Sequence, residues 1–218
     1  MYHQRLRYML IIGAGGHAKE LLDVLISNGY DNLFFYDDLP ANTASRMFSK
    51  FQIIKKEQEA TRYFKQTDKR FVLGMGGSIL RQSMAVKLHS LGGDLTTVIS
   101  KKAQVSDFDV SIGDGVNIMH HVIIQPSVVI GEGTLINASA LVHHDTVIGK
   151  YCEMAPAAII TGGCMIGDFT FIGSGAIILP GLCVGKNVVI GAGAVVTKDV
   201  ADNAKVSGIP AKAMNKND

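Results

Sequence analysis

Four of the seven histidines form two adjacent pairs, His120-His121 and His143-His144, and Asp145 follows the second pair. An imidazole titrates near neutral pH, so it can take a proton from a reacting group. A neighbouring carboxylate that accepts its other N–H fixes the tautomer and stabilises the imidazolium. This chemistry predicts His144 as a general base oriented by Asp145, with His143 as the second choice. Clustered histidines can also bind zinc, so the positions of the two pairs in the fold decide between these uses.

A second group of candidates is the glycine-rich turn that begins at Gly13 and runs through Gly15, Gly16 and His17. It follows a strand expected at residues 8–12 and precedes a helix expected at 17–27. Glycines in this position let backbone N–H groups approach a phosphate at the start of the helix. The structural alternative is a turn that only packs the strand against the helix.

Asp37 and Asp38 lie about 20 residues beyond this turn, after a strand expected at 33–36, and can accept hydrogen bonds from a ribose or a base. Further on we expect a loop through the forties, a polar helix at 55–65 and a strand at 70–74. A helix capped by Ser78 and a strand at 95–99 complete a small parallel α/β sheet. This is one mononucleotide-binding half, which favours a nucleotide head group, such as that of a nucleotide sugar, over a dinucleotide.

The rest of the chain has a six-residue period. Every sixth residue from Ile112 to Val196 is aliphatic or Met, and a second series from Val110 to Ala194 is small or apolar. An Ile-Gly or Val-Gly pair recurs every 18 residues from Ile112 to Gly185, so three hexads make one triangular coil. A period of six fits no helix and predicts a hexapeptide-repeat β-solenoid in which both series face inward.

The solenoid decides how the histidine pairs point. Ala140 and Val142 belong to the inward series, so His143, His144 and Asp145 project outward at a corner. His120 and His144 are 24 residues apart, which is not a multiple of 18, so they occupy different corners and do not form one zinc site. Cys152 and Cys164 fall in the inward series and are expected to be core side chains.

Composition excludes some classes of protein. The net charge is +2 and 18% of residues are charged, with no basic run, which argues against a nucleic-acid binder. No apolar stretch approaches the ~20 residues that span a bilayer, and the N-terminus lacks a signal-peptide cleavage pattern. We expect a cytoplasmic protein with no membrane insertion.

The hexads, the segment 191–199 and the tail 208–212 resemble the left-handed β-helix acyltransferases. The first glycine turn, the Asp pair and Gly76 are similar to those of the nucleotide-linked 4-amino-sugar N-acetyltransferases and the related sialic-acid O-acetyltransferase-like group. This resemblance implies a Rossmann-like α/β domain at residues 1–96. It implies a left-handed parallel β-helix with a C-terminal tail at 97–218.

The same resemblance implies direct transfer of an acetyl group from acetyl-CoA to the amine of a nucleotide-linked 4-amino-4,6-dideoxy sugar. It also implies a homotrimer whose product feeds glycan or lipopolysaccharide assembly. His144 is in the family's register for the general base, followed by Asp145 and the next Ile-Gly. The implied nucleotide-sugar contacts are Gly13, Gly15, Gly16, His17, Asp37, Asp38 and Gly76. The implied acetyl-CoA contacts are Gly162, Ser174 and Ala192, with residues 210–212 near the nucleotide end of the donor.

One position departs from the family. Relatives carry a second histidine nine residues after the base, where this chain has Glu153. The inward register of Cys152 and Met154 turns Glu153 outward, so either the donor is held differently or Glu153 serves the acceptor's amine. The His-x4-His pair of β-helical zinc carbonic anhydrases is absent, and no metal is predicted. The alternatives are a sugar (sialic-acid-like) O-acetyltransferase and a non-catalytic nucleotide-binding trimer.

Overall fold

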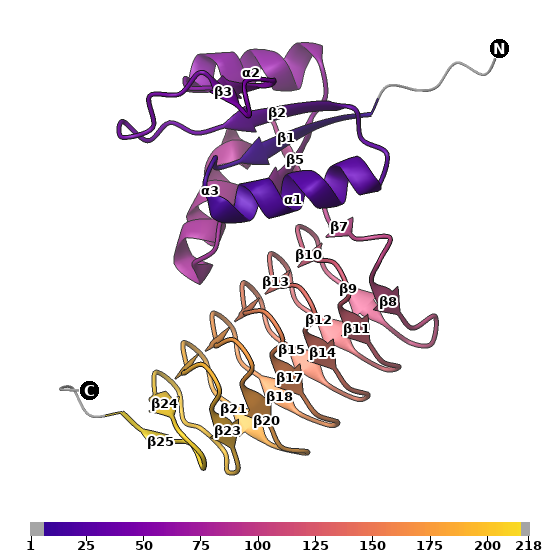
Figure 1. The fold of residues 1–218 in the computed structure, drawn as a ribbon, viewed down its shortest axis with the longest axis vertical. Coiled ribbons are helices and arrows are strands. Elements are labelled where there is room, and N and C mark those ends of the chain that lie inside the picture. The colour runs from indigo at the N-terminus through magenta and orange to yellow at the C-terminus, as the bar shows by residue number, and fades with distance from the viewer. Residues whose placement is uncertain (1–6, 215–218) are drawn as a thin grey trace.

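The computed structural model describes residues 7–214 and contains an α/β domain seated on one end of a triangular β-helix (Figure 1). The domain has a six-stranded sheet of order β3-β4-β2-β1-β5-β6, parallel except for the β3–β4 pair. Its elements are β1 (Tyr8–Ile12), α1 (Gly16–Ser27), β2 (Asn32–Tyr36), β3 (Arg46–Met47), β4 (Phe51–Ile54), α2 (Glu57–Gln66), β5 (Arg70–Leu73), α3 (Ser78–Ser90) and β6 (Asp94–Leu95). The predicted Rossmann-like α/β domain is confirmed.

Three local predictions were wrong. The expected loop through the forties contains β3, and β4 just after it pairs in parallel with β2. A four-residue strand is too short to show a period of its own, and its pairing partner lies elsewhere in the chain. Ser78 begins α3 rather than capping it, because Gly77 is the N-cap residue. The strand expected at 95–99 is two strands, β6 in the α/β sheet and β7 (Val98–Ile99) in the β-helix.

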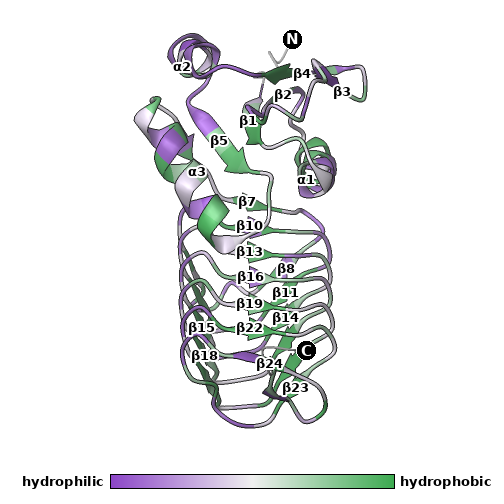
Figure 2. Cartoon of the chain, turned by 90° about the vertical axis from the view of Figure 1, so that its left-hand side faces the viewer, coloured by the Kyte–Doolittle hydropathy of each residue, from purple (hydrophilic) through white to green (hydrophobic). Residues whose placement is uncertain are grey.

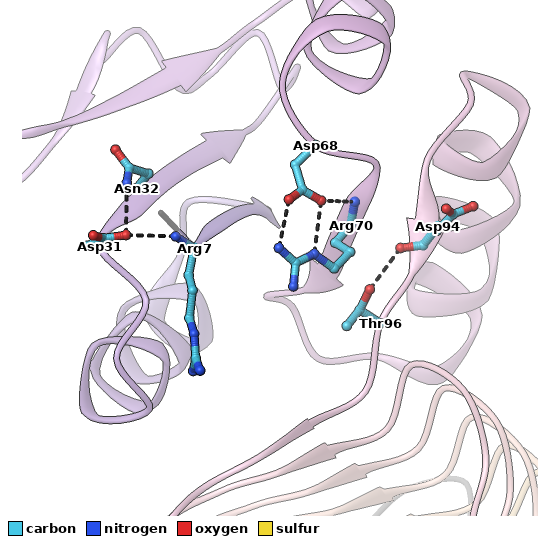
Figure 3. Close-up of polar contacts among 7 residues, drawn as sticks. All are labelled: Arg7, Asp31, Asn32, Asp68, Arg70, Asp94 and Thr96. Carbon is cyan, nitrogen blue, oxygen red and sulfur yellow. Dashed lines mark hydrogen bonds and ion pairs between the residues drawn. The ribbon is translucent and has the colours of Figure 1, made fainter. Parts of the chain in front are cut away.

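Helices cover both faces of the α/β sheet, so alternate residues of β1 enter different cores. Met9 and Ile11 pack with α1, while Leu10 and Ile12 pack with α2 and α3. Polar side chains near the amino ends of the strands form hydrogen bonds with neighbouring residues (Figure 3). The Arg70 guanidinium donates two hydrogen bonds to the Asp68 carboxylate, at 2.9 and 2.7 Å, and the backbone N of Arg70 donates a third at 2.9 Å. The carboxyl ends of β1 and β5 lead into glycine turns instead.

The β-helix consists of three parallel sheets that each coil visits in turn (Figure 2). Face 1 contains β7, β10 (Asn117–Ile118), β13 (Leu135–Ile136), β16 (Glu153–Met154), β19 (Phe171–Ile172), β22 (Val189–Ile190), β24 (Lys205–Ser207) and the antiparallel β25 (Lys212–Ala213). Face 2 contains β8 (Gln104–Val105), β11 (Ile123–Ile124), β14 (Leu141–Val142), β17 (Ile159–Ile160), β20 (Ile177–Ile178) and β23 (Val195–Val196). Face 3 contains β9 (Ser111–Ile112), β12 (Val129–Ile130), β15 (Val147–Ile148), β18 (Met165–Ile166) and β21 (Cys183–Val184). The predicted left-handed parallel β-helix is confirmed.

The six-residue period has a physical cause at the corners. One residue in every hexad from Asp109 to Gly193 has φ between 50° and 73°, which turns the chain toward the next face. Both predicted inward series line the core, where Val110, Ile112 and Leu182 are partly buried and the others fully buried. The coils therefore share one continuous apolar core.

The predicted inward cysteines are confirmed. Cys152 and Cys164 are fully buried, and burial raises the pKa of the Cys152 thiol to about 12. The predicted domain boundary at residues 96 and 97 falls between β6 and β7 and stays a prediction. No helix within residues 7–214 is long and apolar enough to cross a membrane.

Candidate active site

A cavity of about 560 Å³ opens at the carboxyl edge of the α/β sheet. Its walls come from the β1–α1 turn, the segment after β2, the β5–α3 turn and one side of α3. The sequence-predicted nucleotide residues that line it are Gly13, Gly15, Gly16, His17, Asp37, Asp38 and Gly76. The fold therefore brings together residues from three separate turns, as expected for the carboxyl ends of parallel strands.

The start of α1 faces this cavity. Gly15 is the N-cap residue and makes no side-chain hydrogen bond, so the first N–H groups of α1 are free of a side-chain cap. A Cβ on Gly15 or Gly16 would meet no atom within 4 Å. The positive end of the helix dipole and this open space can receive an anion such as a phosphate.

His17 lies in the first turn of α1 with its side chain only 11% exposed. Neither ring nitrogen has a hydrogen-bond partner within the described chain, although Nδ1 lies 3.5 Å from a Glu20 carboxylate oxygen. Burial, with a smaller contribution from the positive charge of Arg81, lowers the pKa of His17 to about 4. A neutral imidazole at pH 7 offers a ligand one donor and one acceptor.

The two aspartates differ in their surroundings. Asp37 is buried, and its carboxylate accepts hydrogen bonds from Leu39 N at 3.1 Å and Asn42 Nδ2 at 2.8 Å, which shapes the loop after β2. Asp38 Oδ2 accepts hydrogen bonds from the Tyr36 hydroxyl at 3.0 Å and from Lys87 Nζ. Burial opposes ionisation of Asp38, but these hydrogen bonds outweigh it and lower its pKa. Asp37 therefore supports the loop, while Asp38 is held at the cavity by hydrogen bonds that favour its charged form.

Glu153 projects from β16 on face 1 of the β-helix and reaches the α/β domain. Its Oε2 accepts a hydrogen bond from Gly77 N at 2.7 Å. A Cβ on the adjacent Gly76 would lie 3.0 Å from Oε1. The outward orientation agrees with its register between Cys152 and Met154.

His144 and Asp145 occupy the corner between β14 and β15, where faces 2 and 3 meet. His144 Nδ1 lies 2.7 Å from Asp145 Oδ2, and the His144 side chain is 59% exposed. The other ring nitrogen, Nε2, is then free to take a proton. The ring lies against Gly162 of the next coil, where a Cβ would come within 2.6 Å of the imidazole.

The other predicted residues occupy different corners. Ser174 and Ala192 are exposed on the corner between faces 1 and 2, whereas Gly162 shares the corner of His144. His120 lies on the Ser174 corner, with Nδ1 2.5 Å from Ser100 Oγ and Nε2 3.2 Å from Asp23 Oδ2 on α1. His120 thus joins the two domains, and the prediction that it is separate from His144 is confirmed.

The structure also identifies residues that no motif indicated. Tyr36, Leu80 and Met84 line the cavity, and Lys87 bridges Asp38 and Glu57 beside it. The α3 residues among these have ordinary helical spacing, so sequence carries no signal that separates them from core or surface positions. Among residues 7–214, no group of three or more His, Cys, Asp and Glu side chains is placed to hold a metal ion.

Two segments match known protein families. Residues 9–88 match the PglD N-terminal domain, and residues 163–198 match the bacterial transferase hexapeptide (six repeats). No curated protein sequence matches the chain.

Solved structures similar to this chain cover nearly all of it. One is a perosamine N-acetyltransferase from Caulobacter crescentus, with one histidine replaced by asparagine, in complex with CoA and GDP-perosamine. It is 31% identical with a TM-score of 0.88, over 95% of this chain and 97% of that chain. The acetyltransferase domain of PglB from Neisseria gonorrhoeae FA1090, in complex with acetyl coenzyme A, is 29% identical with a TM-score of 0.87, over 96% and 100% of the two chains. WeeI from Acinetobacter baumannii AYE is 26% identical with a TM-score of 0.86, over 95% and 100%. The chain therefore belongs to the family of sugar N-acetyltransferases in which a PglD N-terminal domain precedes a left-handed hexapeptide-repeat β-helix.

Proposed function

We propose that this chain transfers the acetyl group of acetyl-CoA to the amine of a nucleotide-linked 4-amino-4,6-dideoxy sugar. One observation carries the proposal. The chain combines an uncapped glycine turn on a 560 Å³ cavity with a His–Asp pair at 2.7 Å, in a protein 31% identical to a perosamine N-acetyltransferase bound to CoA and GDP-perosamine.

The α/β domain would bind the nucleotide. Backbone N–H groups at Gly15 and Gly16 approach the diphosphate at the start of α1. Asp38 accepts hydrogen bonds from the ribose or base, and His17 supplies a neutral donor and acceptor. Gly13 and Gly76 line the two flanking turns of the site, and the atoms nearest a Cβ on Gly76 belong to the Glu153 carboxylate.

His144 would act as general base. Its Nε2 takes a proton from the amine as nitrogen attacks the thioester carbonyl, and Asp145 stabilises the imidazolium through Nδ1. The C–N bond forms, the C–S bond breaks, and the proton passes to the departing thiolate of CoA. Backbone amides stabilise the oxyanion of the tetrahedral intermediate, and no acyl-enzyme is needed.

A homotrimer would complete the site. The His144 corner lies between faces 2 and 3, opposite face 1, which carries Glu153 beside the cavity. One chain therefore holds its base and its cavity on opposite sides of the prism, and a neighbouring copy must supply one of them. Three copies close such a heterologous contact into a ring.

Faces 2 and 3, which meet at the His144 corner, suit this contact. The outward positions of face 2 are apolar in five successive coils and those of face 3 in three, at Val129, Val147 and Met165, whereas the corner between faces 3 and 1 carries charge in six. The apolar positions of face 2 are Ile123, Leu141, Ile159, Ile177 and Val195, and the charged ones are Asp114, Glu132, Lys150, Asp168, Lys186 and Asp202. Face 2 also lies between the corners that hold Gly162 and Ser174, so packing it against a copy forms a groove for acetyl-CoA there, with Ala192 on the next coil.

The test is release of the CoA thiol from acetyl-CoA with UDP-, dTDP- and GDP-linked 4-amino-4,6-dideoxy sugars, beside sialic acid. We expect release with one amino sugar, and kcat about 100-fold to 10,000-fold lower for His144→Asn. His143→Asn is the matched control and should retain activity. Thiol release only with sialic acid would assign O-acetylation. If none of the acceptors supports thiol release, the nucleotide-binding trimer remains.

A complementation experiment tests the shared site. Gly15→Asp places a negative charge where the phosphates bind, in a position open enough to accept the side chain. Co-expression of Gly15→Asp and His144→Ala chains should restore activity if each site takes its cavity and its base from different copies. No recovery in verified mixed trimers would mean that one chain holds a complete site.

A further inference from the structure

The β5–α3 turn, residues 74–77, contributes Gly74, Met75 and Gly76 to one wall of the cavity. Three of its four residues are Gly74, Gly76 and Gly77, and Gly77 has a φ of 84°. Helix α3 begins directly after it with no side-chain cap from Gly77. Glycine has the largest conformational freedom of any residue, so this wall depends on contacts from outside the turn.

Two charged side chains supply those contacts from opposite directions. Arg81 of α3 is fully buried, and its Nη1 donates to the carbonyls of Leu73 at 3.1 Å and Met75 at 2.8 Å. Its Nε donates to Gly133 O of the β-helix at 2.9 Å. Glu153 accepts the N–H of Gly77 at 2.7 Å from the β-helix side. The turn is therefore held by its carbonyl groups at one end and by an N–H group at the other.

The two charges also support each other. Burial lowers the pKa of Arg81 to about 10, and the negative charge of Glu153 opposes that shift. A buried cation left without a compensating negative charge is strongly destabilising. Glu153 also places a carboxylate at the positive end of α3, which the helix dipole favours.

We propose that Glu153 is a positioning residue for the nucleotide sugar. Through Gly77, and together with Arg81, it holds the β5–α3 turn that supplies this cavity wall, so the shape of the pocket depends on the β-helix. This inference rests on the proposed function in taking the cavity as the nucleotide-sugar site. Glu153, at the position where relatives carry a histidine, then shapes the acceptor pocket and does not serve the acetyl donor.

Gly76 offers an internal test of this arrangement. A Cβ there would lie 3.0 and 3.1 Å from the two Glu153 carboxylate oxygens, and its backbone is outside the left-handed region. Gly76→Ala therefore disturbs mainly the Glu153 carboxylate. In a chain that carries Glu153→Ala, the same substitution no longer meets the Glu153 carboxylate.

The experiment measures two quantities in the full-length protein. Binding of UDP, dTDP and GDP is measured by calorimetry, and KM for the acceptor and for acetyl-CoA by thiol release. Loss of a hydrogen bond to a charged group predicts that Glu153→Ala weakens nucleotide binding and raises the acceptor KM about tenfold, with kcat and the acetyl-CoA KM within about twofold. Glu153→Gln should recover most of the loss, because its amide oxygen can still accept from Gly77. Val189→Ala, at the same outward position two coils further along face 1, is the control and should change nothing.

The double variant Gly76→Ala/Glu153→Ala should bind as well as Glu153→Ala alone, and this non-additivity is the sign of direct coupling. If Glu153→Ala lowers the melting temperature so far that binding cannot be measured, Gly76→Ala and Glu153→Gln decide the question. Unchanged nucleotide binding and acceptor KM in Glu153→Ala, or additive losses in the double variant, would overturn the proposal. A collapse of kcat that Glu153→Gln does not rescue would also overturn it, because Glu153 would then act on the reacting amine.

The outcomes separate this inference from the proposed function. If Glu153→Ala weakens nucleotide binding but the wild-type protein transfers no acetyl group, the positioning role is supported and the transferase function is contradicted. If the wild type transfers acetyl groups and Glu153→Ala has unchanged nucleotide binding and acceptor KM, the transferase function is supported and the positioning role is contradicted. A wild-type protein that binds none of the three nucleotides contradicts both.

Discussion

The glycines of the β-helix and those of the first α/β turn occupy opposite surroundings. A Cβ on Gly131 would lie 2.5 Å from the backbone of Gly149 in the next coil, whereas a Cβ on Gly15 or Gly16 would meet no atom within 4 Å. The first glycine is required because two backbones stack too closely for a side chain. The other two leave a space that the protein itself does not fill, which is what a bound phosphate requires.

Gly162 is a third case, and it belongs to the active corner. The three atoms nearest a Cβ there all belong to the His144 ring. The molecule therefore contains three kinds of glycine. Gly131 is needed by the fold, Gly162 positions a side chain, and Gly15 and Gly16 make room for a ligand. Substitution by alanine at each kind of position should give a different result.

The largest effect is expected for Gly131→Ala. Its Cβ would lie within 2.7 Å of three backbone atoms of Gly149 and Lys150, which cannot move without separating the coils. We expect the free energy of unfolding to fall by about 3 kcal/mol, at the upper end for overpacking, in a denaturant titration. A loss below about 0.5 kcal/mol would contradict the packing explanation.

Gly162→Ala should lower activity while leaving the fold intact. The clash is with an exposed ring that can rotate away, so the free energy of unfolding should change by less than about 1 kcal/mol. A general base displaced by about 1 Å is expected to lose about 100-fold in kcat. The control is the same substitution in a His144→Asn chain, where it should produce no further loss. An additional loss there would mean that Gly162 acts independently of His144.

His17 should make stability depend on pH. Its pKa is about 4 in the folded protein and 6.5 in the unfolded chain, so the unfolded chain binds more protons between these values. Stability therefore decreases as pH falls, by about 2 kcal/mol between pH 7 and pH 5. His17→Asn should remove this part of the slope in unfolding titrations at the two pH values. An unchanged slope would show that the imidazole is not buried in its neutral form.

The smallest effect on stability is expected for Gly16→Ala. Alanine favours the helix and meets no atom here, so the free energy of unfolding should stay within about 1 kcal/mol of wild type. Binding of the preferred nucleoside diphosphate should weaken about tenfold, because the Cβ occupies the space for the phosphate. Calorimetry beside thermal unfolding checks both quantities. Normal binding in this variant would place the phosphate elsewhere.

Local and periodic features were predictable. The inward series predicted the β-helix core, and it correctly turned His144, Asp145 and Glu153 outward. The first glycine turn and the Asp pair predicted cavity residues, because strand, turn and helix follow one another directly in the chain. Strands β3 and β4 were missed, because such short strands are stabilised by pairing, β4 with β2 and β3 with β4, and not by a pattern of their own.

By itself, the sequence determined the triangular β-helix, its corners and the first glycine turn. Each hexad packs only on its neighbours, and each strand–turn–helix unit is continuous, so these features depend on short-range regularity. The tertiary structure alone decided how the two domains meet. The contacts of Glu153 with Gly77, Arg81 with Gly133 and His120 with Asp23 join residues 76, 52 and 97 positions apart. These separations follow no period, because they arise where an aperiodic α/β surface lies against a periodic one, and only the folded chain brings such residues together.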